Sequence, residues 1–161
     1  LMIAQQACQE KKETVSRSSL AYTLTAIALF DGFISCWDEK FKTNLIRPIT
    51  VINDHVDKNW QPYIQTPPFP EFTSGHAVIS NAAATVLTRL FGDNYEFTDA
   101  TEIPFGNETR RFKSFYEASA EVSWSRVYGG IRYPETARIS IAQGKEIGNY
   151  VLKTLYAAAI K

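Results

Sequence analysis

The chain has little of the features that mark several classes of protein. Its 161 residues include 17 basic and 17 acidic side chains, so it lacks the excess of clustered cations that nucleic-acid binding requires. Its longest apolar run, residues 21–30, ends at Asp31 and Gly32. That run is well short of the roughly 20 residues that span a bilayer. We therefore expect no nucleic-acid partner and no transmembrane segment.

Cysteine and histidine are also scarce. The two cysteines, Cys8 and Cys36, are not spaced like metal ligands, so we expect free thiols and no metal site. The two histidines are His55, in a polar segment that predicts a surface position, and His76, which follows a Ser-Gly pair. Only His76 therefore lies in a context that indicates chemistry.

Helical periodicity is what the chain has in quantity, while strand-like alternation and internal repeats are lacking. At this length we expect a single all-α domain, residues 1–161, built as a helical bundle. Because the chain begins within a predicted helix, we also expect further helices upstream. Between the helices, segments 44–73 and 92–111 are long for a bundle, which is typical of functional loops. The predicted helices are residues 1–13, 18–41, 75–91, 112–128 and 134–159.

Two cations flank the end of the second predicted helix. Lys40 precedes Arg47 by seven residues, nearly two helical turns, so both project from about the same face if the segment between them is helical. Pro48 ends that helix and leaves Arg47 at an exposed rim. A guanidinium offers paired donors that match two phosphate oxygens, and an ammonium adds a point charge. The alternative is a pair of solvated cations.

A proline-rich segment, residues 67–73, opens directly into the predicted helix 75–91. Ser74 or the preceding threonine is a candidate N-cap, and Gly75 lets backbone amides approach an anion closely. The free N–H groups at a helix start bind anions readily. In that first turn, His76 becomes a candidate general acid, the alternative being an ordinary surface or core histidine.

A third group of residues ends the predicted helix 112–128. Arg126 lies on a partly buried stripe, where a guanidinium needs an anionic partner. Gly129 and Gly130 break the helix and present Arg132 from the next turn. A tetrahedral anion is expected between groups that have no other evident shared partner: Lys40, Arg47, Ser74, Gly75, His76 and Arg126.

Together the three segments resemble the phosphatidic acid phosphatase type 2 and vanadium-dependent haloperoxidase superfamily. Its signature is Lys-x6-Arg-Pro, then Pro-Ser-Gly-His, then Ser-Arg-x5-His-x3-Asp. The surrounding residues look like the soluble bacterial haloperoxidase-related branch. The positions that match in order and spacing are Lys40, Arg47, Pro48, Ser74, Gly75, His76, Ser125 and Arg126, with Thr73 in place of the first proline of the second motif.

The resemblance implies a function for each matching residue. His76 would act as acid or base, and the bound group would be a small phosphorylated substrate or an inorganic oxyanion, with vanadate as the cofactor of a peroxidase. It also implies an extracytoplasmic location and a partner in the upstream segment of the same protein. The residues that would hold the oxygens of phosphate or vanadate are Lys40, Arg47, Ser74, the Gly75 backbone and Arg126.

The chain departs from the signature at its last motif. Arg132 stands where the family has its second histidine, the phosphatase nucleophile or apical vanadium ligand, and Thr136 stands at the aspartate position beside Glu135. A guanidinium stays protonated and has no lone pair to attack phosphorus or bind a metal. The expected catalytic pair, His76 and Arg132, is therefore incomplete, although Arg132 adds a further cation.

Three interpretations stay open at this point. The first is an enzyme, a phosphoric monoester hydrolase or a haloperoxidase, that is weakened by Arg132. The second is a non-catalytic homologue that binds phosphate or another anion. The third is a scaffold whose motif cations pair with local carboxylates.

Overall fold

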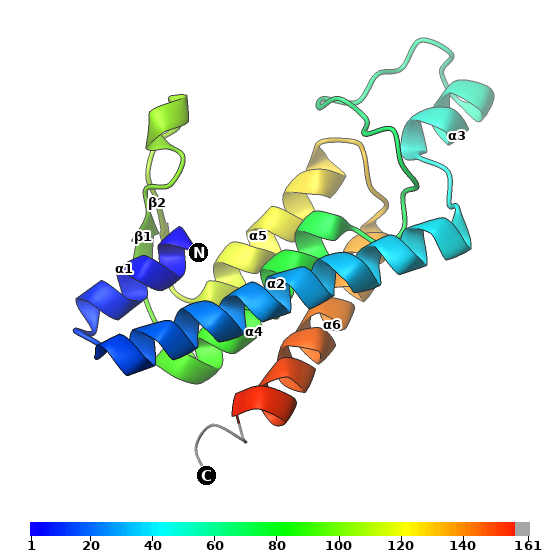
Figure 1. The fold of residues 1–161 in the computed structure, drawn as a ribbon. Coiled ribbons are helices and arrows are strands. Elements are labelled where there is room, and N and C mark those ends of the chain that lie inside the picture. The colour runs from blue at the N-terminus through cyan, green and yellow to red at the C-terminus, as the bar shows by residue number, and fades with distance from the viewer. Residues whose placement is uncertain (157–161) are drawn as a thin grey trace.

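The computed structural model describes residues 1–156, and these form an all-α bundle with one small hairpin (Figure 1). The predicted fold class is thus confirmed. In chain order the elements are α1 (Met2–Glu10), α2 (Val15–Thr43), α3 (Pro48–His55), α4 (Gly75–Phe91), β1 (Phe97–Asp99), a 3-10 turn (Ile103–Phe105), β2 (Arg110–Phe112), α5 (Phe115–Tyr128), α6 (Pro134–Val151) and a π-helical turn (Leu152–Tyr156).

All five predicted helices are present, with shifted ends. The first ends at Glu10 rather than residue 13, and the last is α-helical to Val151 and then π-helical to Tyr156. The predicted residues 157–159 of that helix lie outside the described part of the chain. The boundary of greatest functional interest, the start of α4 at Gly75, is confirmed.

A helix and a two-stranded hairpin inside the predicted loops were missed. Helix α3 occupies eight residues of segment 44–73 and begins at Pro48. Helix α2 already ends at Thr43, so the prediction that Pro48 ends the helix of Lys40 is wrong, and Arg47 lies in the non-helical link between the two helices. Only Pro48 of α3 is buried, so no apolar stripe announces this helix, and His55 at its end is exposed as predicted. The antiparallel strands β1 and β2 are three residues each, too short to show an alternating pattern.

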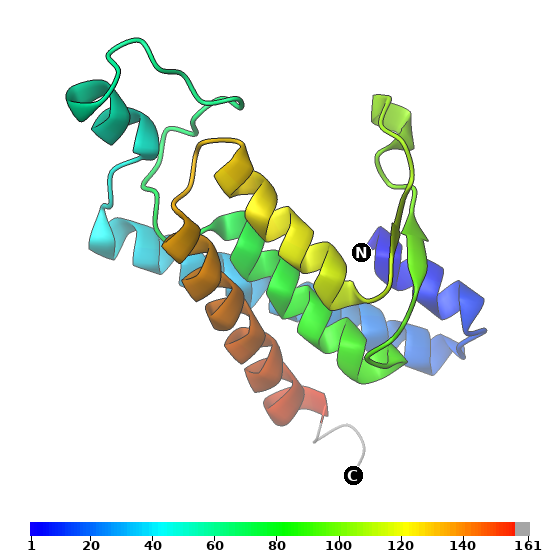
Figure 2. The same cartoon turned by 180° about the vertical axis from the view of Figure 1, so that it is seen from behind.

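Helix α4 forms the centre of the bundle, where it packs against α2, α5 and α6 (Figure 2). Small residues allow close approach on the α6 side, because the α carbons of Gly144 and Gly148 face the backbone of α4. A polar contact joins α4 to α5, where the amide nitrogen of Asn81 donates to Ser123 Oγ at 3.1 Å. One core cluster is shared by α2, α4 and α6 and consists of Leu24, Ala28, Ala82, Val86 and Val151.

The hairpin end of the bundle has its own aromatic core. Tyr95 and Phe115 stack with ring centroids 5.0 Å apart, and Phe97 lies 5.6 Å from Phe112 across the hairpin. Ala4 and Ala7 of α1 close this cluster. It lies at the opposite end of the bundle from α3 (Figure 1).

Helix α2 carries apolar side chains that the described residues leave bare. Phe30, Ile34 and Phe41 are 66%, 52% and 58% exposed. The helical segment Val15–His55 contains a window that is long and apolar enough to cross a membrane, contrary to the expectation from residues 21–30 alone. A single such helix is weak evidence for a span, because a core helix passes the same test of length and composition.

The close α4–α6 contact gives a first prediction. A Cβ atom at Gly148 would lie 2.6 Å from Thr85 Cβ and 2.7 Å from the Ala82 carbonyl oxygen, so Gly148→Ala must push the helices apart. We expect the free energy of unfolding to fall by about 2 kcal/mol, as for other overpacked cores.

Gly32→Ala is the matched control. Its Cβ would meet nothing closer than 3.5 Å within a helix, so better helix propensity should raise stability by up to about 1 kcal/mol. Urea unfolding of both variants measures the difference. Equal effects of the two substitutions would contradict the close packing of α4 on α6.

Candidate anion-binding site

The three sequence motifs meet at one end of the bundle, where α2 and α5 end and α4 and α6 begin. The segment Phe69–Thr73, which precedes α4, lies at the centre of this region, because its carbonyl oxygens accept hydrogen bonds from Lys40 and Arg47. Arg47 also reaches the Gly129–Tyr133 turn through the carbonyl oxygen of Ile131. Residues far apart in sequence are thus joined at this end.

Lys40 lies fully buried beneath that segment. Its ammonium donates to the carbonyl oxygens of Pro70, at 3.0 Å, and Glu71, at 3.3 Å, and makes a short contact to that of Thr73. Burial, and secondly the nearby charge of Arg132, lower the pKa of Lys40 to about 8. Three carbonyl oxygens therefore match the three donors of this ammonium, and Lys40 contributes charge rather than a free donor.

Arg47 is buried too, at 7% exposed, so the expectation of an exposed rim is wrong. Its Nε donates to Phe69 O at 3.0 Å, one terminal nitrogen to Ile131 O at 2.9 Å, and the other to Pro70 O at 3.3 Å. The carbonyls draw the guanidinium inward. The premise that Lys40 and Arg47 have no shared partner except an anion is also wrong, because both bind the Pro70 carbonyl oxygen.

Arg132 differs from the other two cations in its free donors. It is 6% exposed, and within residues 1–156 its Nε and one terminal nitrogen, Nη1, have no hydrogen-bond partner. That terminal nitrogen lies 4.0 Å from Glu71 Oε1, which is an ion pair without a hydrogen bond. Burial first, and then Arg47, lower the pKa of Arg132 to about 10, so the guanidinium is charged at neutral pH.

Two buried hydroxyls of the second motif likewise lack hydrogen-bond partners among residues 1–156. Thr73 Oγ1 and Ser74 Oγ have no partner within the described residues. Ser74 is the N-cap of α4 as predicted, yet its side chain caps nothing, and its backbone N–H donates to Ser140 Oγ at 2.8 Å. An unpaired buried polar group costs about 1–3 kcal/mol, so these hydroxyls mark a place where a further polar partner fits.

Glu71 is the residue that sequence reasoning missed. Its carboxylate is fully buried and accepts hydrogen bonds from the backbone N–H of Tyr133 at 3.0 Å and from Thr136 Oγ1 at 2.8 Å. Thr136, at the family's aspartate position, therefore contacts this distant carboxylate. A single acidic residue within a stiff proline-rich segment was the available signal.

His76 and Arg126 lie on the cavity side of this region. Together with Ser80 and Ser125 they line part of a cavity of about 700 Å³ between α2, α4 and α5, whose wall also includes residues of α1 and of the hairpin. The Arg126 Nε donates to Ser125 Oγ at 3.2 Å. The His76 side chain is exposed to solvent, yet partial desolvation, then the charge of Arg126 and then that of Arg132 lower its pKa, which favours the neutral imidazole near pH 7.

The charges of the cationic residues act on one another, which indicates that the motifs converge. Arg132 lowers the pKa of both Lys40 and His76, and Arg47 lowers that of Arg132. Among the predicted residues, Arg126 and His76 face the cavity, whereas Lys40, Arg47 and Arg132 lie in the buried layer next to the segment Phe69–Thr73.

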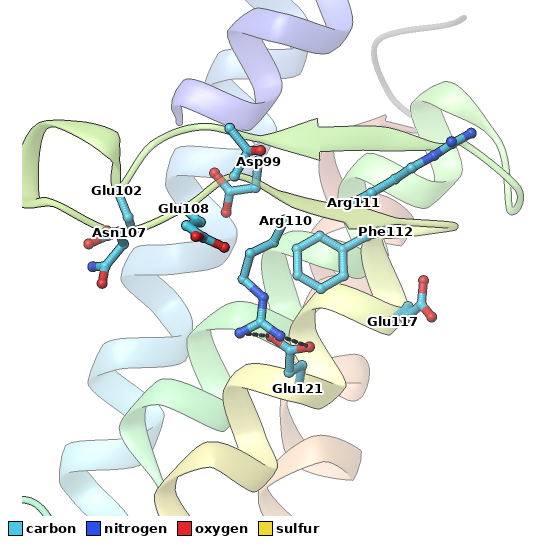
Figure 3. Close-up of a pocket in the computed structure, with 10 residues that line it drawn as sticks. Asp99, Glu102, Asn107, Glu108, Arg110, Arg111, Phe112, Glu117 and Glu121 are labelled. Carbon is cyan, nitrogen blue, oxygen red and sulfur yellow. Dashed lines mark hydrogen bonds and ion pairs between the residues drawn. The ribbon is translucent and has the colours of Figure 1, made fainter.

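A second cavity of about 830 Å³ lies beside the hairpin (Figure 3). Its wall includes Asp99, Glu102 and Glu108, and Arg110 pairs with Glu121 at 2.8 Å. In the described part of the chain, no three His, Cys, Asp or Glu side chains are grouped to hold a metal ion. The Arg110–Glu121 pair is well exposed, as expected for a solvated surface pair of little energetic weight.

Comparison with solved structures agrees with this architecture. The first bacterial vanadium-dependent iodoperoxidase is 50% identical, with a TM-score of 0.92 over 95% of this chain and 37% of that chain. Holo-type and apo-type structures of a bacterial vanadium-dependent chloroperoxidase are 20% identical, cover 85% of this chain and 35% and 36% of theirs, and give TM-scores of 0.71 and 0.70. At that identity they show the fold alone.

The chain thus spans little more than a third of the length of these relatives. No curated protein matches it. The family model that describes the VCPO second helical-bundle domain matches residues 52–159. The chain therefore belongs to the family of the VCPO second helical-bundle domain, within the vanadium-dependent haloperoxidase superfamily.

Proposed function

We propose that this domain binds a tetrahedral oxyanion, phosphate or vanadate, without a covalent bond, and that its peroxidase or phosphatase turnover is weak. The observation that carries the proposal is the buried guanidinium of Arg132, which keeps two nitrogen atoms unpaired among residues 1–156. A buried cation with unused donors needs an anion. The oxyanion of the relatives' cofactor, or the phosphate that resembles it in shape, has the required acceptors.

The supporting groups divide into two kinds. Lys40 and Arg47 use their donors on the carbonyl oxygens of the segment Phe69–Thr73, so they supply positive charge and fix its backbone. Arg132, Ser74 Oγ and the first-turn amides of α4 supply donors to the anion. Arg126, on the cavity side, completes the set at the entrance.

Vanadate fits this set as an oxyanion but not as an anchored group. When bound with an anchoring ligand, vanadate supplies the peroxide activation of a haloperoxidase. Arg132 has no lone pair to serve as that ligand. The chain's two histidines are His76, in the first turn of α4, and His55, which is exposed at the end of α3 and lies outside every motif. His76 is neutral at pH 7 and becomes more basic when an anion binds beside it, so its part is proton transfer.

The second candidate is a non-catalytic homologue that recognises an anion or a phosphorylated ligand. The same Arg132 favours it, because an added cation strengthens anion binding and removes covalent catalysis. The two candidates differ in whether restoring a histidine at residue 132 brings turnover.

Arg132→His tests this difference. We expect aryl phosphate hydrolysis, or iodide and bromide oxidation with peroxide and vanadate, to rise at least about tenfold, because an imidazole offers the missing lone pair. Phosphate affinity should fall, since a fixed guanidinium is lost. Steady-state assays and calorimetry measure the two effects.

Arg138→His is the matched control, since Arg138 lies on the exposed face of α6 and pairs with Glu135 at 3.1 Å. It should change neither activity nor affinity. Strong wild-type turnover that Arg132→His leaves unchanged would show that another residue carries the chemistry, and the proposal would then fail.

The buried ammonium predicts a pH dependence of binding. Because the pKa of Lys40 is lowered to about 8, its charge is present at pH 7 and lost as the pH rises through 8. Free phosphate becomes more negative over the lower part of that range, which by itself would strengthen binding, so a fall in affinity reports the loss of the ammonium charge. We expect phosphate affinity to fall about fivefold or more between pH 7 and about 9, below the pKa of Arg132, from the loss of one nearby charge.

Lys40→Arg separates the titration of Lys40 from any other cause of lower phosphate affinity at high pH. A solvated or well-paired guanidinium stays charged through this range, so the variant should show no fall in affinity as the pH rises, even if its affinity is lower throughout. A wild-type affinity that does not fall either would exclude Lys40 as the titrating group.

We also propose that the upstream segment of the same protein covers the bare face of α2. The exposed Phe30, Ile34 and Phe41 support this, because apolar patches of this kind mark missing partners. The relatives have further chain beyond the part that this sequence matches.

The double substitution Phe30→Ser and Ile34→Ser tests the cover. In the full-length protein it should lower the melting temperature by several degrees, since each buried side chain contributes about 1.5–3 kcal/mol. Phe105→Ser is the control, because Phe105 is 77% exposed in the hairpin connection. If the double variant melts like the control, α2 is not covered in the full-length protein.

A further inference from the structure

Glu71 is a buried carboxylate among buried cations, and the oxyanion site as proposed makes no use of it. Its side chain is fully buried, and its charge acts on Lys40, Arg47 and Arg132. A carboxylate taken out of water costs several kcal/mol unless hydrogen bonds and opposite charges compensate. A buried carboxylate at this position therefore needs compensating hydrogen bonds and nearby positive charges.

Both carboxylate oxygens are engaged by the start of α6. Oε1 accepts from the Tyr133 backbone N–H at 3.0 Å, and Oε2 accepts from Thr136 Oγ1 at 2.8 Å. Tyr133, the N-cap of α6, provides no side-chain cap of its own. Glu71 thus caps α6 from a distant segment, and the positive end of the helix dipole favours its charge.

This capping holds the carboxylate short of Arg132. The two side chains approach to 4.0 Å without a hydrogen bond, and both are almost fully buried. If Oε1 and Oε2 were free, a bidentate pair with the guanidinium would be the expected outcome. Instead the donors on α6 satisfy Glu71, and Arg132 keeps Nε and Nη1 unpaired among residues 1–156.

We propose that Glu71 is the residue that sets the affinity of the oxyanion site, as an internal counter-ion that Thr136 and the Tyr133 amide hold away from Arg132. Its charge offsets one cation, which keeps the bound anion exchangeable. Its hydrogen bonds to α6 leave the Arg132 donors to the external anion. Thr136 is the positioning residue of this arrangement, and the inference rests on the proposed oxyanion binding.

The test compares phosphate affinities of full-length variants by calorimetry. Glu71→Gln keeps the shape and the contacts to α6 but removes the charge, so we expect about tenfold tighter binding. Thr136→Val keeps the charge but frees Oε2 to approach Arg132, so we expect roughly fivefold weaker binding. Glu135→Gln, an exposed glutamate in the first turn of α6, should leave affinity unchanged.

The two variants separate this role from a purely structural one. A structural Glu71 would weaken binding in both, so an unchanged or weaker affinity of Glu71→Gln overturns the inference while wild-type binding upholds the proposed function. An unchanged affinity of Thr136→Val also overturns it. If neither the wild type nor any variant binds phosphate, the proposed function fails, and this inference fails with it.

Melting curves show whether each variant folds. If Glu71→Gln does not fold, Thr136→Val decides the matter alone, because it removes a single restraint and keeps the buried charge. Weaker phosphate binding by a folded Thr136→Val supports the inference if the same substitution has no effect in an Arg132→Gln background, where Glu71 has no guanidinium to approach. An equal loss in both backgrounds, or unchanged binding by Thr136→Val, refutes it.

Discussion

The removal of three cations from water at one end of the bundle is the constraint on which this structure depends. Lys40, Arg47 and Arg132 are each less than 10% exposed. Isolated buried charges of this kind cost several kcal/mol each. Part of that cost is offset by the segment before α4, because its carbonyl oxygens accept hydrogen bonds from Lys40 and Arg47, and by Glu71, whose buried carboxylate lies 4.0 Å from Arg132. The remaining deficit lies at Arg132.

The packing of α6 against α4 connects this cation-rich end to the rest of the bundle. Glycines on α6 allow it to lie directly against α4, and that contact places Ser140 next to the start of α4. Ser140 Oγ accepts from the Ser74 N–H at 2.8 Å and donates to the Thr136 carbonyl oxygen at 2.6 Å. This hydroxyl therefore links the start of α4, where the proposed anion site lies, to the helix whose first turn contacts Glu71. A shift of α6 would disturb both.

The elements that the sequence predicted correctly are those with a helical period of apolar residues or with a glycine at a helix end. Apolar spacing located five helices, and the Gly75 and Gly129 positions located the ends that carry the motifs. Helix α3 and the hairpin escaped, because eight and three residues are too few to show a period. The motifs identified the cationic side chains. Their spacing does not predict which of the side-chain N–H donors will hydrogen-bond to backbone carbonyl oxygens. Arg47 was thus expected at a rim, although the Phe69, Pro70 and Ile131 carbonyl oxygens bury it.

Glu71 lay beyond sequence reasoning for a related reason. Its partners, Tyr133 and Thr136, are more than 60 residues away, and only the folded bundle brings them to the carboxylate. A motif identifies the side chains that contact the bound group. A counter-ion such as Glu71 is identified by the charged side chains that lie close to it in the folded protein. That information exists only once the charges have been placed in space.

An arginine in place of a histidine at residue 132 alters the reactions that the proposed site can support more than it alters the charge of that site. A guanidinium binds the ground state of a tetrahedral oxyanion and its transition state through the same donors. Such uniform binding lowers the dissociation constant without lowering the barrier to reaction. A neutral imidazole in the same place gives up some affinity but offers a lone pair that is used only as the reaction proceeds. The proposed oxyanion site therefore keeps the charge that the family's motif supplies but lacks this lone pair, which is why we expect anion binding rather than turnover.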